Sequence, residues 1–229
     1  GMDRVILLLP AYNEEPRIPN TIRMVKTAIE NIKNYSFTIL VVDDGSVDNT
    51  APVSEKEGAV VLKHPENMGK GMAHRTAFKY AGEKGYDIII ALDADGQHDP
   101  AEIPLFLKAS MEYPVVIGKR NANIRNMPLI RYFTNYITSM VTSLLAGKKV
   151  RDSQSGYRLF RREVFTRFRL KTTRFQTESE EIIQAGRMGF SIGEVPIKTI
   201  YRDSGRKSYI HPVIDTLRFI KMAWDCIWL

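Results

Sequence analysis

Two aspartates, Asp93 and Asp95, follow a purely apolar run at residues 88–92, with a single residue between them. A short apolar run with a polar, turn-prone end is typical of a buried parallel strand that opens onto a loop. Open α/β sheets bind ligands at the carboxyl ends of such strands, and carboxylate oxygens suit Mg2+ or Mn2+. The pair therefore predicts a metal that clamps a nucleotide diphosphate. Taken alone, it fits a solvated acidic loop equally well.

The bulk composition fits one α/β domain with an ordinary core, since 44% of the 229 residues are apolar. The net charge of +7 indicates anionic partners such as phosphate groups, nucleic acid or an anionic membrane surface. One cysteine, Cys226, excludes an internal disulfide and indicates a reducing, cytoplasmic location. Neither a signal-peptide pattern nor a run of about 20 apolar residues occurs, so we expect no membrane span.

Strand and helix patterns alternate along residues 1–120. This alternation predicts the α/β class, with βαβ units and a mostly parallel sheet flanked by helices. The expected strands are residues 5–9, ended by Pro10, and residues 37–42, 59–62, 88–92 and 115–118. Helices are expected at residues 18–32, in a short segment that ends near Glu57, at residues 70–84, and after Pro100.

The pattern changes near residue 120, where a polar loop precedes a helix predicted over residues 128–145. We expect the apolar stripe of this helix to face the core, with a membrane or dimer contact as the alternative. The stripe consists of Ile130, Phe133, Ile137, Val141 and Leu144. A loop from Ser153 is expected to enter a strand near Phe160, followed by helices at residues 178–187 and 213–228 and a strand at 191–200.

Acidic or glycine-rich loops follow the first four predicted strands, and a parallel sheet brings such loops to one edge. Crowded carboxylates cost free energy unless a cation or donor groups compensate, so the set favours a ligand site more strongly than any one loop does. Asp43 suits hydrogen bonding to a base or ribose. The turn at residues 67–71 opens a helix and can present backbone N–H groups and the Lys70 ammonium to phosphate.

Four motifs lie in order along the first 100 residues, at 10–15 (PAYNEE), 41–48 (VVDDGSVD), 67–71 (NMGKG) and 93–98 (DADGQH). They resemble those of the inverting family 2 glycosyltransferases, which have the nucleotide-diphospho-sugar transferase (GT-A) fold. Later segments look more narrowly like dolichyl-phosphate mannose synthases and other polyprenyl-phosphate sugar synthases. These segments are residues 117–120, 128–131, 155–158 and 193–197.

The resemblance implies a hexosyltransferase that moves a sugar from a GDP- or UDP-sugar to dolichyl or undecaprenyl phosphate with inversion. It implies one catalytic domain over residues 2–229. The nucleotide-binding half would reach residue 120, and the acceptor-binding half, residues 121–229, would end in an amphipathic helix. Many such synthases carry membrane helices beyond this point. We therefore expect a soluble form, a membrane partner protein, or a piece of a longer chain.

The same resemblance assigns the donor residues. Pro10, Tyr12 and Glu14 would hold the base and ribose, with Asp43 at the base edge. Asp93 and Asp95 would bracket the sugar nucleotide and its Mg2+ or Mn2+, with Ala94 beside the donor. Gln97 would be a further metal ligand or a neighbour of the metal.

Arginines and lysines match the phosphate-binding positions of these synthases. Arg120 and Arg131 would hold the acceptor phosphate, and Arg202 would close over the diphosphate. This chain has Gly205-Arg206-Lys207-Ser208 where the family often has Gly-x-Ser-Lys, so Lys207 is the expected diphosphate-facing lysine. Arg158 and Arg125 are further candidates for the acceptor pocket, because arginine pairs bidentately with phosphate.

The acceptor decides whether the site needs a base. A phosphate is already ionised near neutral pH, whereas a saccharide hydroxyl in cell-surface glycan synthesis would require a general base. Glu178 and Glu180 are the candidates, with Glu180 preferred, although both also fit a solvated first turn of a helix. The sequence favours a phosphate acceptor.

Other classes of function fit less well. A nucleotidyltransferase would carry a basic, glycine-rich loop after its first strand, where this chain has an acidic one. The clustered acids oppose nucleic-acid binding at this edge. A non-catalytic nucleotide-sugar-binding protein stays open, although the intact Asp43, Asp93 and Asp95 favour an enzyme.

The last predicted helix, residues 213–228, is amphipathic. Its aromatic and apolar residues include Trp224 and Trp228, and its basic residues are Arg218 and Lys221. Such a helix can lie on an anionic membrane surface, so we expect a peripheral membrane contact as one alternative. Packing on the protein's own core or on a partner subunit is the other, and the preferred one.

Overall fold

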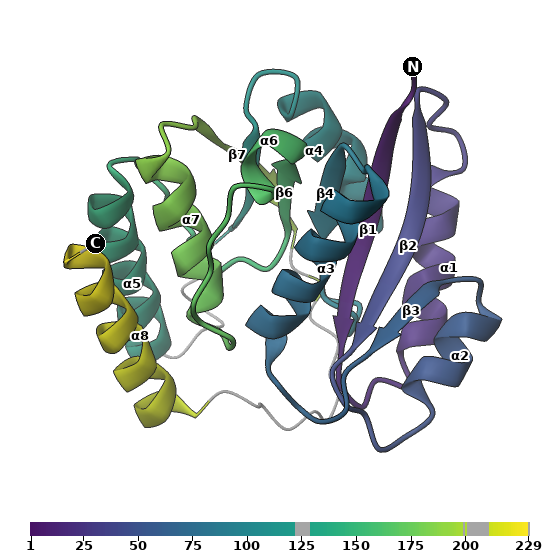
Figure 1. The fold of residues 1–229 in the computed structure, drawn as a ribbon, viewed down its shortest axis with the longest axis horizontal. Helices are drawn as coiled ribbons and strands as arrows, with labels where there is room; N and C mark the ends of the chain where they lie inside the picture. Colours follow the sequence, from purple (N-terminus) through teal and green to yellow (C-terminus); the bar gives the residue numbers. More distant parts are fainter. Residues whose placement is uncertain (122–128, 199, 201–210, 229) are drawn as a thin grey trace.

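A mixed sheet of seven strands forms the centre of the molecule, in the order β3-β2-β1-β4-β6-β5-β7, with helices on its faces (Figure 1). The computed structural model describes residues 1–121, 129–198, 200 and 211–228, with the backbone alone at 129–131 and 212. Within these residues the strands are β1 Asp3–Ala11, β2 Tyr35–Asp43, β3 Val60–Lys63, β4 Ile88–Ala91, β5 Val115–Arg120, β6 Arg158–Arg161 and β7 Ile192–Ile197.

The described helices lie at or near the predicted positions, except for the short α6, which was not predicted. None of them has the length and apolar character needed to span a membrane. They are α1 Ile18–Ile29, α2 Thr50–Lys56, α3 Lys70–Lys84, α4 Ile103–Ala109, α5 Leu129–Ala146, α6 Arg162–Phe165, α7 Thr177–Arg187 and α8 Pro212–Ile227, with a 3-10 turn, η1 Pro100–Glu102, before α4. β1 pairs in parallel with β2 and β4, and β2 pairs in parallel with β3. The predicted mostly parallel sheet is confirmed, with β6 antiparallel between β4 and β5.

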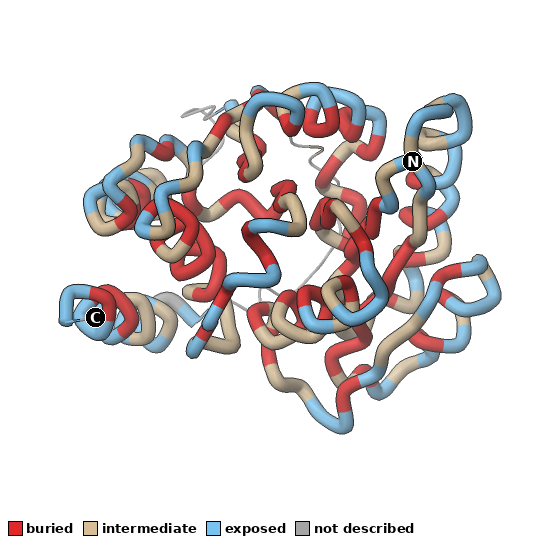
Figure 2. Tube along the Cα trace, turned by 45° about the horizontal axis from the view of Figure 1, so that its top comes forward, coloured by how far each residue is buried: buried red, intermediate tan, exposed pale blue. Residues whose placement is uncertain are grey.

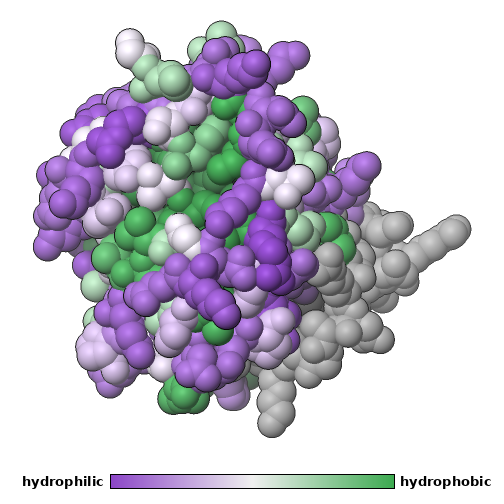
Figure 3. All heavy atoms as spheres, turned by 90° about the vertical axis from the view of Figure 1, so that its right-hand side faces the viewer, coloured by the Kyte–Doolittle hydropathy of each residue, from purple (hydrophilic) through white to green (hydrophobic). Residues whose placement is uncertain are grey.

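Both faces of the sheet are covered, which explains why its strands read as continuous apolar runs. Alternate residues of β1 enter different cores: Leu7 packs with α1 on one face, and Leu8 packs with α3 and α7 on the other. Buried residues line the strands and the inner helix faces in Figure 2. The surface at the β3 end of the molecule is mixed, with hydrophilic residues at its margin and also between the hydrophobic ones (Figure 3).

The prediction that Pro10 ends the first strand was wrong. β1 continues to Ala11, in register with β2. The Ala11 carbonyl accepts from Asp44 N on the β2 side, whereas the Leu8 carbonyl accepts from Leu92 N on the β4 side. Pro10 therefore faces the β4 side, beyond the end of β4, where its missing N–H removes no ladder bond.

The prediction that the apolar stripe of α5 faces the core was also wrong. Phe133, Ile137 and Leu144 are each more than half exposed. The face of α5 that packs inward carries small residues instead, including the buried Ser139 and Thr142. Hydrophobic periodicity located the helix correctly but assigned the wrong side to the interior.

α7 packs closely against the end of α5 at Gly186. A Cβ at Gly186 would overlap the carbonyl oxygen and Cβ of Ala146. Arg187 Nε donates to the Leu145 carbonyl at 3.1 Å beside this contact. A side chain at position 186 must therefore push α7 away from α5.

We expect Gly186→Ala to lower the free energy of unfolding by about 1–3 kcal/mol, because it overpacks the α5–α7 contact. Gly82→Ala in α3 is the matched control, since a Cβ there would lie 3.6 Å from Thr166 Cγ2, an ordinary contact. The control should raise stability by up to about 1 kcal/mol, as alanine favours a helix over glycine. Urea unfolding measures both variants, and equal stabilities would contradict the close packing.

Candidate functional site

The loop after β4 is held in place by side chains from two other parts of the chain. The Ala94 carbonyl accepts from Thr21 Oγ1 of α1 at 3.0 Å. The Tyr157 hydroxyl donates to the Asp99 carbonyl at 3.0 Å, and the rings of His98 and Tyr157 stack with centroids 5.1 Å apart. Ala94 is buried and its carbonyl anchors the loop to α1, while its predicted place beside the donor stays a prediction.

A lysine connects two acids across the site. Lys70 Nζ, at the start of α3, lies 2.8 Å from Asp93 Oδ1 and 2.7 Å from Glu178 Oε1, in the first turn of α7. Burial lowers the pKa of Lys70, but the two carboxylates outweigh burial and raise it, so the ammonium stays charged. A Cβ at Gly156 would lie 2.7 Å from Lys70 Nζ and 2.9 Å from Asp93 Oδ1, so only glycine leaves room for the pair.

His98 supports the same aspartate. Its Nδ1 accepts from the backbone N–H of Asp93 at 3.0 Å, and its Nε2 lies 3.7 Å from Asp93 Oδ2. Burial lowers the pKa of His98 despite the nearby Asp93, so the ring is neutral at neutral pH. With Nδ1 as the acceptor, the proton is on Nε2 and faces the carboxylate.

The chemistry of the predicted metal ligands fits a divalent cation. Asp95 is buried and its Oδ1 accepts from Gln97 N at 3.0 Å, which orients the carboxylate within the loop. The described residues contain no cluster of three histidine, cysteine, aspartate or glutamate side chains that could hold a metal. Mg2+ and Mn2+ need fewer, because they bind through one or two carboxylates and complete their shell with phosphate oxygens and water.

Asp43, at the end of β2, presents an acceptor that the described protein does not use. Its side chain is fully buried, and Oδ1 accepts from Ser46 N at 3.0 Å. Oδ2 has no hydrogen-bond partner among the described residues. A buried carboxylate oxygen without a donor is costly, so this atom is suited to a ligand N–H or O–H.

The first loop lies beside Asp43. The backbone N–H groups of Asn13 and Glu14 donate to Ser46 Oγ and Thr50 Oγ1, each at 2.9 Å. Glu14 is buried and its Oε2 accepts from Arg17 Nε at 2.9 Å. Pro10 and Tyr12 flank the end of β1 on this edge, so the structure brings the predicted base- and ribose-binding residues together.

Two amides of the glycine-rich turn before α3, which was predicted to bind phosphate, donate to the protein itself. The N–H groups of Met68 and Gly69 donate to Asp44, at 2.9 and 2.8 Å. The N–H of Met72 donates to the Thr173 carbonyl at 2.8 Å. These amides are already satisfied by the protein, and Lys70 serves as a counter-ion to Asp93.

Close packing explains the glycines of that turn. A Cβ at Gly69 would overlap the Thr173 carbonyl and Arg174, and one at Gly71 would overlap the Thr177 side chain. Arg174 also donates to Asn67 Oδ1 at 2.9 Å. The turn therefore docks against the segment that leads into α7.

Arg120, at the end of β5, is paired within the protein. Its Nε donates to Asp152 Oδ2 and its Nη2 donates to Asp152 Oδ1, each at 2.8 Å. Burial lowers the pKa of Arg120, but the Asp152 hydrogen bonds and charge outweigh it, and the net shift is upward. Asp152 thus holds a charged guanidinium, still partly exposed, near Asp93 and Glu178.

The prediction that Arg158 lines an acceptor pocket was wrong. Arg158 is fully buried and donates to Glu181 Oε2 at 3.0 Å and to the Glu178 carbonyl at 2.8 Å. Glu181 Oε1 lies 2.6 Å from His74 Nδ1 of α3. These three side chains join β6, α7 and α3, so Arg158 is a structural residue.

Glu180 does not fit the predicted role of a base. Its two oxygens accept from the N–H groups of Lys171 and Thr172, each at 2.9 Å, and Oε1 also accepts from Gln184 Nε2 at 3.1 Å. Glu180 therefore secures the loop before α7. Glu178, two residues earlier in the same turn and on another side of α7, is the acid that faces Lys70.

The remaining predicted phosphate-binding residues lie outside the described part of the chain. Arg125, Arg202 and Lys207 are not described, and Arg131 is described by its backbone alone, in the first turn of α5. Ile200 N donates to the Gln97 carbonyl at 3.0 Å. Ile200 therefore lies beside the loop that carries Asp95.

Sequence reasoning missed Asp44, Asp152 and Thr21. Asp44 lies directly next to Asp43, so a paired-acid signal was present. Asp152 and Thr21 carry no local signal, because each acts on a residue far away in the chain.

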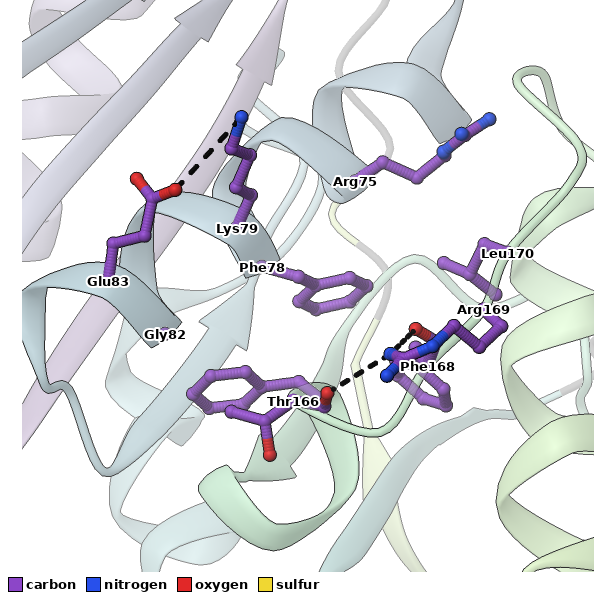
Figure 4. A pocket seen from close by; sticks show the side chains of 10 residues that line it. Arg75, Phe78, Lys79, Gly82, Glu83, Thr166, Phe168, Arg169 and Leu170 are labelled. Atoms are coloured by element: carbon purple, nitrogen blue, oxygen red, sulfur yellow. Dashed lines mark hydrogen bonds and ion pairs between the residues drawn. The ribbon is translucent and has the colours of Figure 1, made fainter.

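A separate cavity of about 510 Å3 lies between α3 and residues 165–170 (Figure 4). None of the predicted site residues is among its described lining residues. Its basic side chains have protein partners: Arg75 donates to the Thr172 carbonyl, Lys79 lies 4.0 Å from Glu83, and Arg169 donates to the Phe168 carbonyl. We assign it no ligand.

Comparison with known proteins gives a consistent result. The family model described as Glycosyl transferase family 2 matches residues 6–168. A UDP-N-acetylglucosamine–dolichyl-phosphate N-acetylglucosaminyltransferase of Methanococcus voltae is 38% identical, over 87% of this chain and 86% of that protein. An undecaprenyl-phosphate mannosyltransferase of Micrococcus luteus is 29% identical, over 88% of this chain and 86% of that protein.

The fold has solved counterparts. Glucosyl-3-phosphoglycerate synthase of Mycobacterium tuberculosis, in complex with Mn2+ and UDP-glucose, aligns with a TM-score of 0.73 and 19% identity. The alignment covers 98% of this chain and 78% of that chain. The predicted GT-A fold is confirmed.

We expect Glu181→Gln to lower the free energy of unfolding at neutral pH by about 3–5 kcal/mol, because it leaves the buried Arg158 without its close carboxylate. Burial raises the pKa of Glu181, but His74 and Arg158 outweigh it and hold the pKa below its ordinary value of 4.5. The stabilisation is therefore present above about pH 4.5 and is lost as the pH falls through the lowered pKa.

Urea unfolding at pH 7 and below pH 4.5 measures this prediction. The difference in the free energy of unfolding between wild type and Glu181→Gln should become smaller at the acidic pH. Glu83→Gln is the matched control, since Glu83 is an exposed partner of Lys79. Exposed ion pairs usually contribute below about 1 kcal/mol. A loss of unfolding free energy in that range for Glu181→Gln at pH 7 would contradict the buried network.

Proposed function

The chain belongs to glycosyl transferase family 2, and on that premise we propose that it transfers a sugar from a nucleotide-diphospho-sugar to a polyprenyl phosphate. Its relatives of known acceptor, in Methanococcus voltae and Micrococcus luteus, are named for dolichyl and undecaprenyl phosphate, and each aligns over most of this chain. The two relatives are named for the transfer of different sugars, N-acetylglucosamine and mannose. The proposed donor of this chain is therefore a GDP- or a UDP-sugar, with the sugar left open. The catalytic domain would span residues 2–229, with the donor half ending near residue 120.

The hydrogen bonds and ion pairs of the two acids on α7 favour a phosphate acceptor over a saccharide hydroxyl. Glu178 pairs with Lys70, and Glu180 holds the 171–172 loop. Both acids thus have partners within the protein, which supports an acceptor that needs no base, as a phosphate does. Transfer to a saccharide hydroxyl is the second candidate, and donor binding without transfer is the third.

The donor would lie along the carboxyl edge of β1, β2 and β4. Asp43 Oδ2 would accept from the base, with Pro10, Tyr12 and Glu14 around the base and ribose. Asp93 and Asp95 would hold Mg2+ or Mn2+ with the diphosphate, and Gln97 would lie beside them. When bound, the metal neutralises the charge that grows on the leaving diphosphate. Arg202 and Lys207 would add fixed positive charge there.

The transfer step needs no proton movement. A phosphate oxygen of the acceptor would form a bond to the anomeric carbon from the face opposite the diphosphate. The bond from that carbon to the diphosphate oxygen would break, and the nucleoside diphosphate would leave with the electron pair. Arg120, kept charged beside Asp152, and Arg131 would orient the acceptor phosphate.

Sugar transfer from labelled GDP- and UDP-sugars to a short polyprenyl phosphate tests this function. We expect label in the organic phase, dependent on Mg2+ or Mn2+ and abolished by EDTA. Asp95→Asn should lower turnover by about 100-fold or more, because it weakens a metal ligand that supports the leaving group. Asp225→Asn, in an exposed pair with Lys221, is the control and should retain turnover.

Label that reaches only water-soluble glycans would favour the saccharide acceptor. Donor binding with neither transfer nor hydrolysis would favour the non-catalytic alternative.

Lys70→Met should tighten Mn2+ binding in the absence of nucleotide by about tenfold or more. The reason is that it removes a positive charge from a ligand carboxylate, and unit charges about 4 Å apart near a protein surface interact by about 4 kcal/mol. Isothermal titration with Mn2+ measures the affinity, and Lys79→Met, at an exposed site, is the control. Unchanged or weaker Mn2+ binding would show that Lys70 does not compete for Asp93.

A further inference from the structure

A short loop connects two of the charged groups in the site. This segment, residues 152–156, is called the bridging loop below. It begins with Asp152, which pairs with Arg120. It ends at Gly156, where a Cβ would lie 2.7 Å from Lys70 Nζ. The position of the bridging loop therefore affects both the guanidinium at one end and the ammonium at the other.

The side chain of Arg158 holds the bridging loop from inside the protein. Arg158 is fully buried, and each nitrogen of its guanidinium donates hydrogen bonds. Nε donates to the Ser155 carbonyl at 3.0 Å, and Nη2 donates to the carbonyls of Ser153 and Ser155. Nη1 donates to the Glu178 carbonyl at 2.8 Å and to Glu181 Oε2 at 3.0 Å. One planar fork thus ties the bridging loop to α7.

The backbone of Arg158 lies between two strands that lead into the site. Arg158 is the first residue of β6, and it pairs with Ala91 of β4 on one side and with Ile117 of β5 on the other. The chain after Ala91 continues to Asp93, and β5 ends at Arg120. The side chain of Arg158 therefore extends from a backbone fixed by the sheet, between the loop that carries Asp93 and the strand that ends in Arg120.

Serines of two helices also hold the bridging loop. Ser139 Oγ of α5 accepts from the backbone N–H of Ser153 at 3.1 Å, and both residues are buried. Gln154 Nε2 donates to Ser179 Oγ of α7 at 2.9 Å. The N–H of Ser153 is thus bound by α5, and its carbonyl is bound by Arg158. Buried backbone groups that lose such partners are costly, so these contacts resist a shift of the loop.

We propose that Arg158 is a positioning residue for sugar transfer. Through the bridging loop, it sets the distance between the Arg120 guanidinium, which would orient the acceptor phosphate, and the Lys70–Asp93 pair beside the leaving diphosphate. Reacting atoms must approach to about 3–3.5 Å, so a loop shift of about 1 Å would impair productive binding of the acceptor. The proposal rests on the proposed function, because it takes Arg120 as the residue that holds an acceptor phosphate.

Steady-state transfer to a short polyprenyl phosphate tests this role. Arg158→Lys keeps a positive charge beside Glu181 but loses the planar fork that reaches both carbonyls of the bridging loop. We expect its KM for the acceptor to rise about tenfold or more, while the dissociation constant for UDP or GDP changes by less than about twofold. A merely structural role would reduce the amount of folded enzyme, and so the apparent kcat, without changing the acceptor KM.

A serine variant provides the same test if Arg158→Lys does not fold. Ser139→Ala removes the acceptor of the Ser153 N–H and leaves no buried charge unpaired, so it should raise the acceptor KM by about threefold. Ser143→Ala is the matched control on the same helix. Ser143 Oγ accepts from Val150 N at 3.0 Å and donates to the Val150 carbonyl at 2.9 Å, outside the bridging loop. Its acceptor KM should equal that of wild type.

A double-mutant cycle tests whether Arg158 acts through the bridging loop. Asp152→Asn should raise the acceptor KM by about tenfold, because it weakens the bidentate pair that holds Arg120. Both changes release the same guanidinium, so the double variant Arg158→Lys/Asp152→Asn should exceed the larger single effect by less than about threefold. Independent effects would multiply to about 100-fold. That product, or an unchanged acceptor KM in both Arg158→Lys and Ser139→Ala, would overturn the proposal.

Titration with Mn2+ in the absence of nucleotide separates this proposal from the proposed function, because it needs no acceptor. In Arg158→Lys, Gly156 would lose its fixed place beside Lys70, so the ammonium should compete less for Asp93. Mn2+ binding should therefore tighten by about threefold or more, and the same change in the Lys70→Met background should have no effect.

The two readouts have distinct outcomes. If wild type transfers no sugar to a polyprenyl phosphate but the Mn2+ titrations show the expected pattern, the proposed function is overturned and the positioning of the Lys70–Asp93 pair stands. If wild type transfers sugar but Arg158→Lys changes neither the acceptor KM nor the Mn2+ affinity, the positioning role is overturned and the function stands.

Discussion

The ammonium of Lys70, held between Asp93 and Glu178, is the interaction on which the site depends. It joins a helix of the first half of the chain, the loop after β4, and a helix of the second half. Two carboxylates this close would repel each other without a cation between them. Gly156 leaves the space for the contact, and His98 supports Asp93 from the other side.

The same halves meet again below the site, where Glu181 bridges His74 and Arg158. This network is fully buried, so its charges are strongly coupled and each needs the others. Glu178 and Glu181 lie on one helix, so α7 positions both the buried network and the Lys70–Glu178 pair. The glycines of the turn before α3 serve this arrangement, because they let α3 approach the segment that leads into α7.

The acceptor half uses its amphipathic helices differently from the donor half. α1 and α3 bury their apolar faces against the sheet, whereas α5 and α8 pack through small or few side chains and leave their apolar stripes outside. The chain is thus divided between a half whose helices cover the sheet with their apolar faces and a half whose helices leave apolar stripes exposed.

The sequence by itself determined the α/β order, the strand ends that carry Asp43, Asp93 and Asp95, and the family motifs, because apolar runs and their breaks are local signals. Only the tertiary structure decided which groups those acids meet. Lys70, predicted to face phosphate, pairs with Asp93 and Glu178, while Arg158 and Glu180 are structural and the α5 stripe faces outward. Each outcome depends on a neighbour distant in the chain, and the periodicity of one helix cannot say which side another element will cover.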